Sequence, residues 1–469
     1  MRSKLCIWVT CLLAVVHTQA QRPQARLSMS LNDCLEYAEK NQVKIKKSLL
    51  DQQLTDAQNK EVTGLALPQL SAKGGINYAP LVAAFVVPNF MKEMIAGNPA
   101  AGADGMVKQS SLNTDVVNAM PDKLMMAFQP KWTTTGTLEA SQLLFDPSVM
   151  VALQARRTLE EMAAKNVSLT VQDIKVAVSK SYYNVLVAEK QKVLIEQNIA
   201  RMNLMKFETE EIYKNGFAEK IDVDRITVTL NNLETQKVKI DQAIRLAYLS
   251  LKFQMGMPLT TELVLTDSLS DKQIDSDILQ AKFEPGMRIE YQLMETQNRL
   301  LAYDLKRYKL AWLPTFSVFG NYGYTLYNMN KLMERGDSWQ KSAILGANLN
   351  FPLFTGFQRK QKARQASLAL QKNQEETYNL KMALELENEN ARITLKNNLL
   401  TLGNQKENML LAEEIYNTAR IKYKEGVGSS LEIMNAESAL KEAQTNYFTA
   451  LYEVIASRVD LQKALGQIK

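Results

Sequence analysis

The side chains that most often carry out chemistry are almost absent from this chain. Its single histidine, His17, and two of its three cysteines, Cys6 and Cys11, lie within the first twenty residues, which leaves Cys34 alone beyond them. A Ser-His-Asp triad and most zinc sites need imidazole, and one cysteine cannot form an intramolecular disulfide. Only carboxylate or lysine chemistry remains. We expect no catalytic residue, no metal site, no cofactor and no enzyme activity, with Cys34 a small packed residue.

The first twenty residues have the pattern of a secretory signal peptide. Arg2 and Lys4 precede an apolar run over residues 5–16, and a small residue, Ala20, ends the segment. This predicts a signal peptide over residues 1–20, with cleavage before Gln21. Its removal would lower the formal charge of the chain from +6 to +4. With both signs interspersed, that charge makes nucleic-acid binding an unfavourable interpretation.

Long helices are the economical interpretation of the proline and glycine distribution. The chain contains 19 glycines and 12 prolines, yet residues 148–257 hold no proline, and their only glycines are Gly216 and Gly256. Proline is also absent from residues 353–469. Within residues 174–202 and 433–464, apolar residues recur in alternating steps of three and four, which is typical of a coiled-coil seam. No stretch beyond the presequence approaches twenty consecutive apolar residues, so we expect no transmembrane helix.

Short alternating segments occur in pairs, one pair in each half of the chain. They cover residues 70–78, 132–141, 316–327 and 342–351, and aromatic residues lie near their ends. A two-residue period over roughly 10 residues is typical of membrane-spanning β-strands. An ordinary soluble sheet with one wet face is the alternative interpretation. The residues between the first pair, 79–130, are expected to form a large loop, and residues 328–338 a short connection.

The two halves are related by an internal repeat. Tyr213-Lys214-Asn215-Gly216 recurs as Tyr423-Lys424-Glu425-Gly426 at an offset of 210 residues, and a Leu-Pro pair precedes the first strand of each half. We expect a first structural repeat over residues 21–258, a polar linker over 259–283 and a second repeat over 284–469. Each repeat would contain a helix, two strands, a very long helix, a hairpin turn at Gly216 or Gly426, and a shorter helix.

Four strands cannot close a membrane barrel, since the smallest known barrels have eight. An open sheet edge is not tolerated in lipid because each unpaired backbone group costs several kcal/mol. If these strands lie in a membrane, the chain must oligomerise. The same symmetry axis would then gather the long helices, which at roughly 1.5 Å per residue are about 100 Å long. The result would be a conduit.

Here the sequence resembles a known family, the TolC-like outer-membrane efflux and secretion channels. The resemblance spans the chain beyond the presequence and rests on short motifs as well as on the duplicated layout. These are Leu67-Pro68-Gln69-Leu70-Ser71, Leu313-Pro314-Thr315-Phe316-Ser317, Phe351-Pro352-Leu353-Phe354-Thr355-Gly356, Tyr423-x-x-Gly426 and Leu431-Glu432-Ile433-Met434-Asn435-Ala436.

The resemblance implies the following fold and function. The fold is mostly α with membrane β: a homotrimer with a twelve-stranded β-barrel continued by a twelve-helix periplasmic α-barrel. The function is a passive exit duct in the outer membrane of a Gram-negative bacterium, extending into the periplasm. The partners are the lipid bilayer, a periplasmic adaptor protein and an inner-membrane efflux or secretion transporter.

The resemblance also implies a periplasmic aperture. In the family an acidic pair, three residues apart after the second hairpin tip, rings this constriction. Here the matching residues are Glu432 and Asn435, so one of the two carboxylates is kept. A ring of Glu432 side chains would attract cations. The alternative is a solvated charge near a helix N-terminus, where carboxylates are also favoured.

A closed-state lock and a docking site come from the same resemblance. Tyr423 and Asp222 match the residues that hold the family's aperture shut, but Gly428 stands in place of the usual arginine. Arg225 or Lys220 is a candidate for the missing cation. The hairpin tips, Gly216 and Gly426, match the adaptor-docking ends; the residues before them, Asn215 and Glu425, replace the usual valine.

Two other function classes stay open. One is a secreted trimeric coiled-coil spacer or adhesin without a pore, which would not need four membrane-length strands. The other is a carbohydrate-active enzyme that uses paired carboxylates. No compact pocket-forming pattern supports the enzyme.

Overall fold

The computed structural model describes residues 27–89, 92, 119–127, 130–269, 277–327 and 339–468. The signal peptide expected over residues 1–20 and the connection over 328–338 lie outside the described residues. The chain forms two compact units, one of residues 1–57, 157–302 and 368–469, the other of residues 58–156 and 303–367. Both halves of the sequence contribute to each unit.

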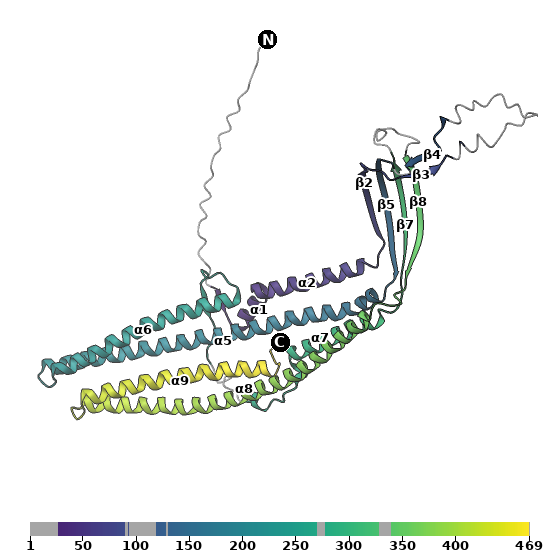
Figure 1. Cartoon of the computed structure of the whole chain (residues 1–469). Helices are drawn as coiled ribbons and strands as arrows, with labels where there is room; N and C mark the ends of the chain where they lie inside the picture. Colours follow the sequence, from purple (N-terminus) through teal and green to yellow (C-terminus); the bar gives the residue numbers. More distant parts are fainter. Residues whose placement is uncertain are drawn as a thin grey trace, which may run out of the picture. The chain divides into compact units, whose positions relative to one another are not determined.

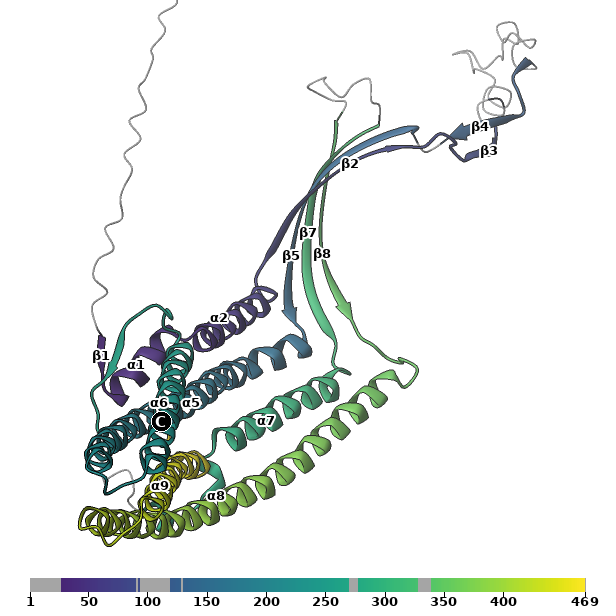
Figure 2. The ribbon, with the colours of Figure 1, turned by 90° about the vertical axis from the view of Figure 1, so that its left-hand side faces the viewer.

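The smaller unit contains a four-stranded antiparallel sheet (Figure 2). Its strands lie in the order β2 (Gln69–Tyr78), β5 (Trp132–Phe145), β7 (Thr315–Leu326) and β8 (Trp339–Asn350). The four strands expected from the alternating pattern are confirmed, with ends that shift by a few residues. Strand β5 is longer than expected and changes register between Leu143 and Phe145. Among the described residues, β2 and β8 are the free edges of this sheet.

The two faces of the sheet differ in polarity. Cross-strand rows on one face join Leu70, Ala140, Gly320 and Leu345, and join Ala72, Leu138, Tyr322 and Ala343. On the other face Lys73 forms a 2.5 Å ion pair with Glu139 of the neighbouring strand. Apolar side chains of the first face are open in the single chain, with Leu345 90% exposed. A sheet that turns an apolar face outward is unlike a soluble sheet, whose apolar face is covered.

The segment over residues 79–130 is more than a loop. Strands β3 (Ala84–Pro88) and β4 (Lys123–Ala127) pair antiparallel within it. The expectation of a plain loop was wrong at these residues. Each strand is only five residues long, which is too short for an alternating pattern to stand out in the sequence.

The larger unit is built mainly from helices (Figure 1). These helices, several of which run on into the smaller unit, are α1 (Leu31–Asn41), α2 (Val43–Gly64), α5 (Pro147–Lys214), α6 (Lys220–Met255), α7 (Ile289–Leu310), α8 (Gln358–Lys424) and α9 (Ser430–Ala464). Within the described part of the chain, no helix has both the length and the apolar character to cross a membrane. Helices α5 and α6 form one antiparallel hairpin, and α8 and α9 form the other (Figure 1).

The coiled-coil seams make up the core of this unit. Ile174, Val178, Val185, Ile195 and Met202 of α5 are at most 3% exposed. The corresponding seam of α9 is also largely buried. Apolar residues at alternating three- and four-residue steps form one stripe on a helix, and burying that stripe holds the hairpins together.

Short elements flank the helices in the region expected as a linker. Strand β6 (Leu263–Leu265) pairs in parallel with β1 (Leu27–Met29), and two 3-10 helices follow, η2 (Asp277–Gln280) and η3 (Pro285–Met287). Beside β1, the side chain of Cys34 is fully buried, as expected for a packed residue.

Candidate functional site

The two hairpin turns have matching backbone geometry. Gly216 follows α5 with φ 81°, and Gly426 follows α8 with φ 75°, a left-handed conformation that favours glycine. The amide of the next residue donates to a carbonyl five residues earlier, Phe217 to Ile212 and Val427 to Lys422, each at 3.0 Å. These bonds satisfy carbonyls at the helix end and reverse the chain within a few residues. The two tips found from the sequence therefore have the expected turn.

The tips lie beside each other because the hairpins share a core. Met202, Ile226, Tyr416 and Ile433, from α5, α6, α8 and α9, belong to one buried cluster. An open pocket of about 810 Å³ is lined by residues from both tips, including Asp222, Arg225, Tyr423 and Ser430. The structure therefore brings the expected lock residues Asp222 and Tyr423 to the same pocket.

Asp222 connects the two hairpins, but through Ser430. The Ser430 hydroxyl, at the start of α9, donates a hydrogen bond to Asp222 Oδ1. Asp222 Oδ2 accepts from the Glu219 amide at 3.3 Å, and Arg225 lies 3.7 Å from the carboxylate within the same helix. Of the two candidate cations, Arg225 is the one beside Asp222.

Tyr423 bonds elsewhere in the pocket. Its hydroxyl donates to Thr209 Oγ1 of α5 at 3.3 Å. A Cβ atom on Gly428 would lie 2.9 Å from the Tyr423 backbone nitrogen. The tip therefore has no room at position 428 for the arginine that the resemblance implies there, unless the backbone shifts.

Glu432 and Asn435 lie in the first two turns of α9 and are both exposed. The Glu432 carboxylate is 3.3 Å from Lys422 Nζ of α8. Its backbone amide donates to the Ser429 hydroxyl, which caps α9. This lysine offsets part of the negative charge that Glu432 brings, and the sequence analysis did not anticipate it.

Large apolar side chains stand at the outermost positions of both tips. Phe217 is 86% exposed and Val427 is 79% exposed. Ile221 and Leu431, at the beginnings of α6 and α9, are about half exposed. These residues escaped the sequence analysis, although an apolar residue directly after each turn glycine was a usable signal. Exposed apolar groups that gather in one place are a common feature of surfaces that bind other proteins.

A buried polar cluster lies behind the tips. Glu437 of α9 is 1% exposed, and neither of its carboxylate oxygens has a hydrogen-bond partner among the described residues. The Arg201 guanidinium lies 5.4 Å from the centre of the Tyr416 ring. Burial raises the pKa of Glu437 and, likewise, the pKa of Tyr416; nearby Arg201 opposes both shifts. A lone buried carboxylate lowers stability when it is ionised.

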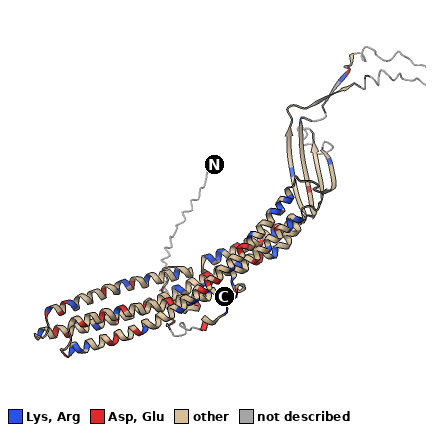
Figure 3. Cartoon of the chain, turned by 60° about the horizontal axis from the view of Figure 1, so that its bottom comes forward, with Lys and Arg blue, Asp and Glu red and all other residues tan. Residues whose placement is uncertain are grey.

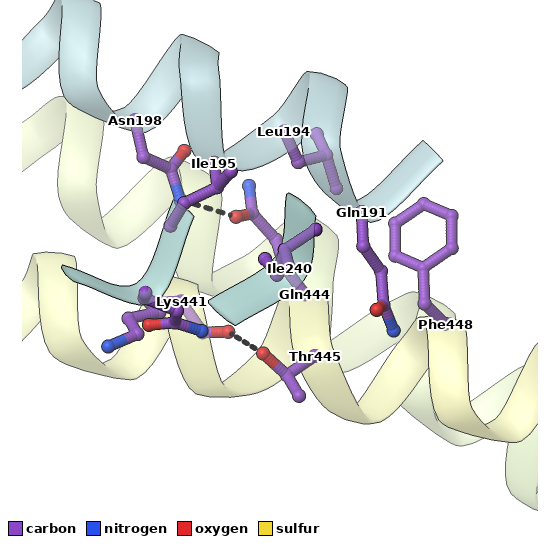
Figure 4. A pocket seen from close by; sticks show the side chains of 10 residues that line it. Gln191, Leu194, Ile195, Asn198, Ile240, Lys441, Gln444, Thr445 and Phe448 are labelled. Atoms are coloured by element: carbon purple, nitrogen blue, oxygen red, sulfur yellow. Dashed lines mark hydrogen bonds between the residues drawn. The ribbon is translucent and has the colours of Figure 1, made fainter. Parts of the chain in front are cut away.

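Side-chain amides continue this cluster along the hairpins. Asn198 accepts a hydrogen bond from Arg201. It donates one to Gln444 Oε1 at 2.9 Å (Figure 4). A pocket of about 90 Å³ beside them is lined in part by Gln191 and Lys441. In the described residues, no three potential metal ligands of the His, Cys, Asp or Glu type gather in one place.

Comparisons with known proteins agree with this geometry. Residues 292–467 match the family described as outer membrane efflux protein. The outer membrane protein TolC of Vibrio cholerae serotype O1 is 20% identical over 337 residues, which cover 70% of this chain and 75% of that protein.

Solved structures extend the likeness to nearly the whole chain. VceC of Vibrio cholerae, an outer membrane protein, matches with a TM-score of 0.68 at 14% identity, covering 93% of this chain and 96% of that one. CusC matches with a TM-score of 0.70 at 15% identity, covering 93% and 92%. MtrE of Neisseria gonorrhoeae, an outer membrane channel in its open state, matches with a TM-score of 0.66 at 15% identity, covering 93% and 88%. Residues 292–467 thus match the outer membrane efflux protein family, and nearly the whole chain has the fold of these solved outer membrane proteins.

Proposed function

We propose that three copies of this chain assemble into an outer-membrane exit duct that is gated at the helical hairpin tips. The observation that carries the proposal is the open sheet with one exposed apolar face. Lipid would cover that face, and pairing of β2 with β8 of the next copy would satisfy both edges. Three copies of the four strands give twelve, a number that barrels accommodate. A pore-free spacer would leave the same apolar face in water.

The number of copies is open to a direct test. Native mass spectrometry of the detergent-solubilised protein should give three chains. Two chains would make an eight-stranded barrel, which can also close without a free edge. A dimer would therefore contradict the trimer while leaving a channel possible. A protein that stays monodisperse as a monomer without detergent would contradict both.

The duplicated layout suggests where the two halves begin and end. We propose structural repeats over residues 21–258 and 284–469, joined by the linker 259–283. The matching left-handed turns at Gly216 and Gly426 support this division. So does the strand order, in which β2 and β5 come from one repeat, and β7 and β8 from the other.

The constriction would lie where the hairpin tips converge on the symmetry axis. Glu432 would then form a ring of carboxylates at the aperture, with Lys422 beside each one at 3.3 Å. Replacing Glu432 by glutamine should lower the preference for cations over anions, measured as a reversal potential in a salt gradient. Lys422→Gln should raise it, because it uncovers the same carboxylate, and Asn435→Asp should raise it further. Unchanged selectivity in all three variants would place the constriction elsewhere.

The tips would also be the contact with a periplasmic adaptor, which in turn meets an inner-membrane efflux or secretion transporter. Exposed Phe217 and Val427 offer apolar anchors for such a partner, beside Gly216 and Gly426. The duct itself is passive, since transport energy would come from the transporter. Polar side chains near the tips, such as Asn215 and Glu425, would set which adaptor fits.

A further inference from the structure

The helix ends next to β7 and β8 form an open pocket of about 360 Å³. It lies where α7 ends and α8 begins, within the smaller unit. Its lining includes three cations, Lys309, Arg359 and Lys360, and three large aromatic rings, Trp312, Phe354 and Phe357. Of the described residues that line it, none carries a carboxylate. Figure 3 shows basic residues along the helix ends that adjoin the strands.

The positive charge at this pocket is not balanced by ion pairs among the described residues. Helix α8 carries Arg359, Lys360, Lys362 and Arg364 close to its start, and no acidic residue in its first turn. The positive end of the helix dipole disfavours cations there. No ion pair to Lys309, Arg359 or Lys360 is found within the described part of the chain. An anion from outside the protein would supply the missing negative charge.

The first half of the chain has a carboxylate at the equivalent helix start. Helix α5 also begins just after a strand, but there Asp146 accepts hydrogen bonds from the amides of Ser148 and Val149, at 2.7 and 3.3 Å. A carboxylate at a helix start is the usual arrangement. The second half lacks this carboxylate and collects cations instead, so the cationic pocket is particular to that half.

Arg359 is held in place without losing its charge. Its Nε donates to Thr355 Oγ1 at 3.1 Å, and its two terminal nitrogens donate to the carbonyls of Ala311 and Leu353, each at 3.4 Å. All three acceptors are neutral. The guanidinium is therefore positioned between the end of α7 and the strand exit, with its full positive charge available to a ligand.

The aromatic side of the pocket is exposed and conformationally strained. Phe357 has φ 63° and is the one non-glycine residue with positive φ in the described chain. Its ring lies edge-on to the ring of Phe354, with centroids 5.5 Å apart. The two rings are 67% and 75% exposed, and Trp312 is 57% exposed. Strain of this kind persists where surrounding structure or a ligand makes use of it.

We propose that this pocket binds the phosphate of an anionic phospholipid in the periplasmic leaflet of the outer membrane. Lys309, Arg359 and Lys360 would hold the headgroup phosphate, and Phe354 and Phe357 would contact the upper acyl chains. Tryptophan is favoured at this depth of a bilayer, and clustered cations beside a membrane recognise anionic headgroups. The site would fix the vertical position of the second strand pair. The proposal rests on the membrane placement of the proposed function.

Tryptophan fluorescence tests the pocket, because Trp312 lines it. In a Trp132→Phe, Trp339→Phe background, the purified protein is titrated with phosphatidylglycerol or phosphatidylcholine whose acyl chains are brominated to quench tryptophan. Phosphatidylglycerol should quench Trp312 at lower mole fraction than phosphatidylcholine. Affinity for phosphatidylglycerol should fall about fivefold for each of Lys309→Gln, Arg359→Gln and Lys360→Gln. Arg359→Lys should keep most of the preference.

Matched controls separate the pocket from a diffuse basic surface. Lys362→Gln and Arg364→Gln remove the same charge from the same helix, but neither residue lines the pocket. They should leave the preference nearly unchanged. An equal loss in these controls, equal quenching by both lipids in the parent, or full competition by inorganic phosphate would each overturn the lipid site.

Conductance of the same samples keeps the two proposals apart. A parent protein that conducts but shows no lipid preference would refute the lipid site and leave the duct standing. A parent that neither conducts nor requires detergent would refute the duct. Because Lys360 makes no ion pair or side-chain hydrogen bond within the described residues, Lys360→Gln should fold and assemble even if Arg359→Gln does not, and its loss of affinity carries the test.

Discussion

Replacing Ser430 by alanine should loosen the connection between the two hairpin tips. The Ser430 hydroxyl donates to the Asp222 carboxylate, and separating α6 from α9 at the tip breaks this bond. Ser430 is 3% exposed and the Asp222 side chain 20%, so solvent can replace the bond only partly. A hydrogen bond to a charged group in such a setting contributes about 2 kcal/mol. The exposed Arg225 ion pair on the same carboxylate adds at most about 1 kcal/mol.

A loss of about 2 kcal/mol shifts the balance between linked and separated tips by about 30-fold in each copy. Single-channel recording should therefore show a higher open probability or a larger conductance for Ser430→Ala. Asp222→Asn should act in the same direction, since it weakens both contacts. Ser430→Thr keeps the hydroxyl and is the control. If Ser430→Ala and Ser430→Thr both record like the parent protein, the Asp222–Ser430 bond does not hold the aperture.

Three further predictions concern the same region. Glu437→Gln should raise the thermal unfolding temperature at about pH 8. Burial raises the pKa of Glu437 in the folded state. The contribution of Glu437 to the stability of the fold is therefore complete below its unfolded-state pKa of about 4.3 and is lost as the pH rises through its folded-state pKa. The gap between variant and parent should therefore shrink toward about pH 5, and a pH-independent gap would show that Glu437 is not the titrating group. Gly428→Arg, which restores the family's residue, should lower stability and not tighten closure, because its Cβ would meet the Tyr423 nitrogen at 2.9 Å; a smaller conductance with unchanged stability would refute this. A Phe217→Ser, Val427→Ser double variant should bind the cognate adaptor about tenfold more weakly or worse, while its conductance is unchanged. Val238→Ser, which replaces an exposed apolar residue on α6 away from the tips, is the control. Equal adaptor affinity in all variants would show that the docking surface is not at the tips.

The repetitive parts of the fold could be predicted from the sequence. The strands were visible because side chains alternate between two faces, and the hairpin tips because only glycine adopts φ near 80° at little cost. The short pair β3 and β4 was missed because five residues hold too few alternations to exceed chance. Local pattern was therefore sufficient wherever an element was long or needed a special residue.

The contacts of the candidate site depended on tertiary packing, which no local pattern reveals. Ser430 stands 208 residues from Asp222, and nothing in the sequence distinguishes it from Ser429. Glu437 reads as a solvated helix charge, since it falls between apolar seam positions, yet the neighbouring helices bury it. Lys422 and Glu432 come into contact because the tight turn between α8 and α9 folds one helix back beside the other.

The most direct test of a gated duct is single-channel recording of the purified protein in a planar bilayer, beside a Ser430→Ala, Asp222→Asn double variant. A trimeric channel closed at its tips should give small, cation-selective steps in the parent and larger steps in the double variant. Because the double variant weakens the contact between the tips, a closed aperture would not explain an absence of current. If the double variant inserts into the bilayer as an intact oligomer and still carries no current, the chain is not a conduit.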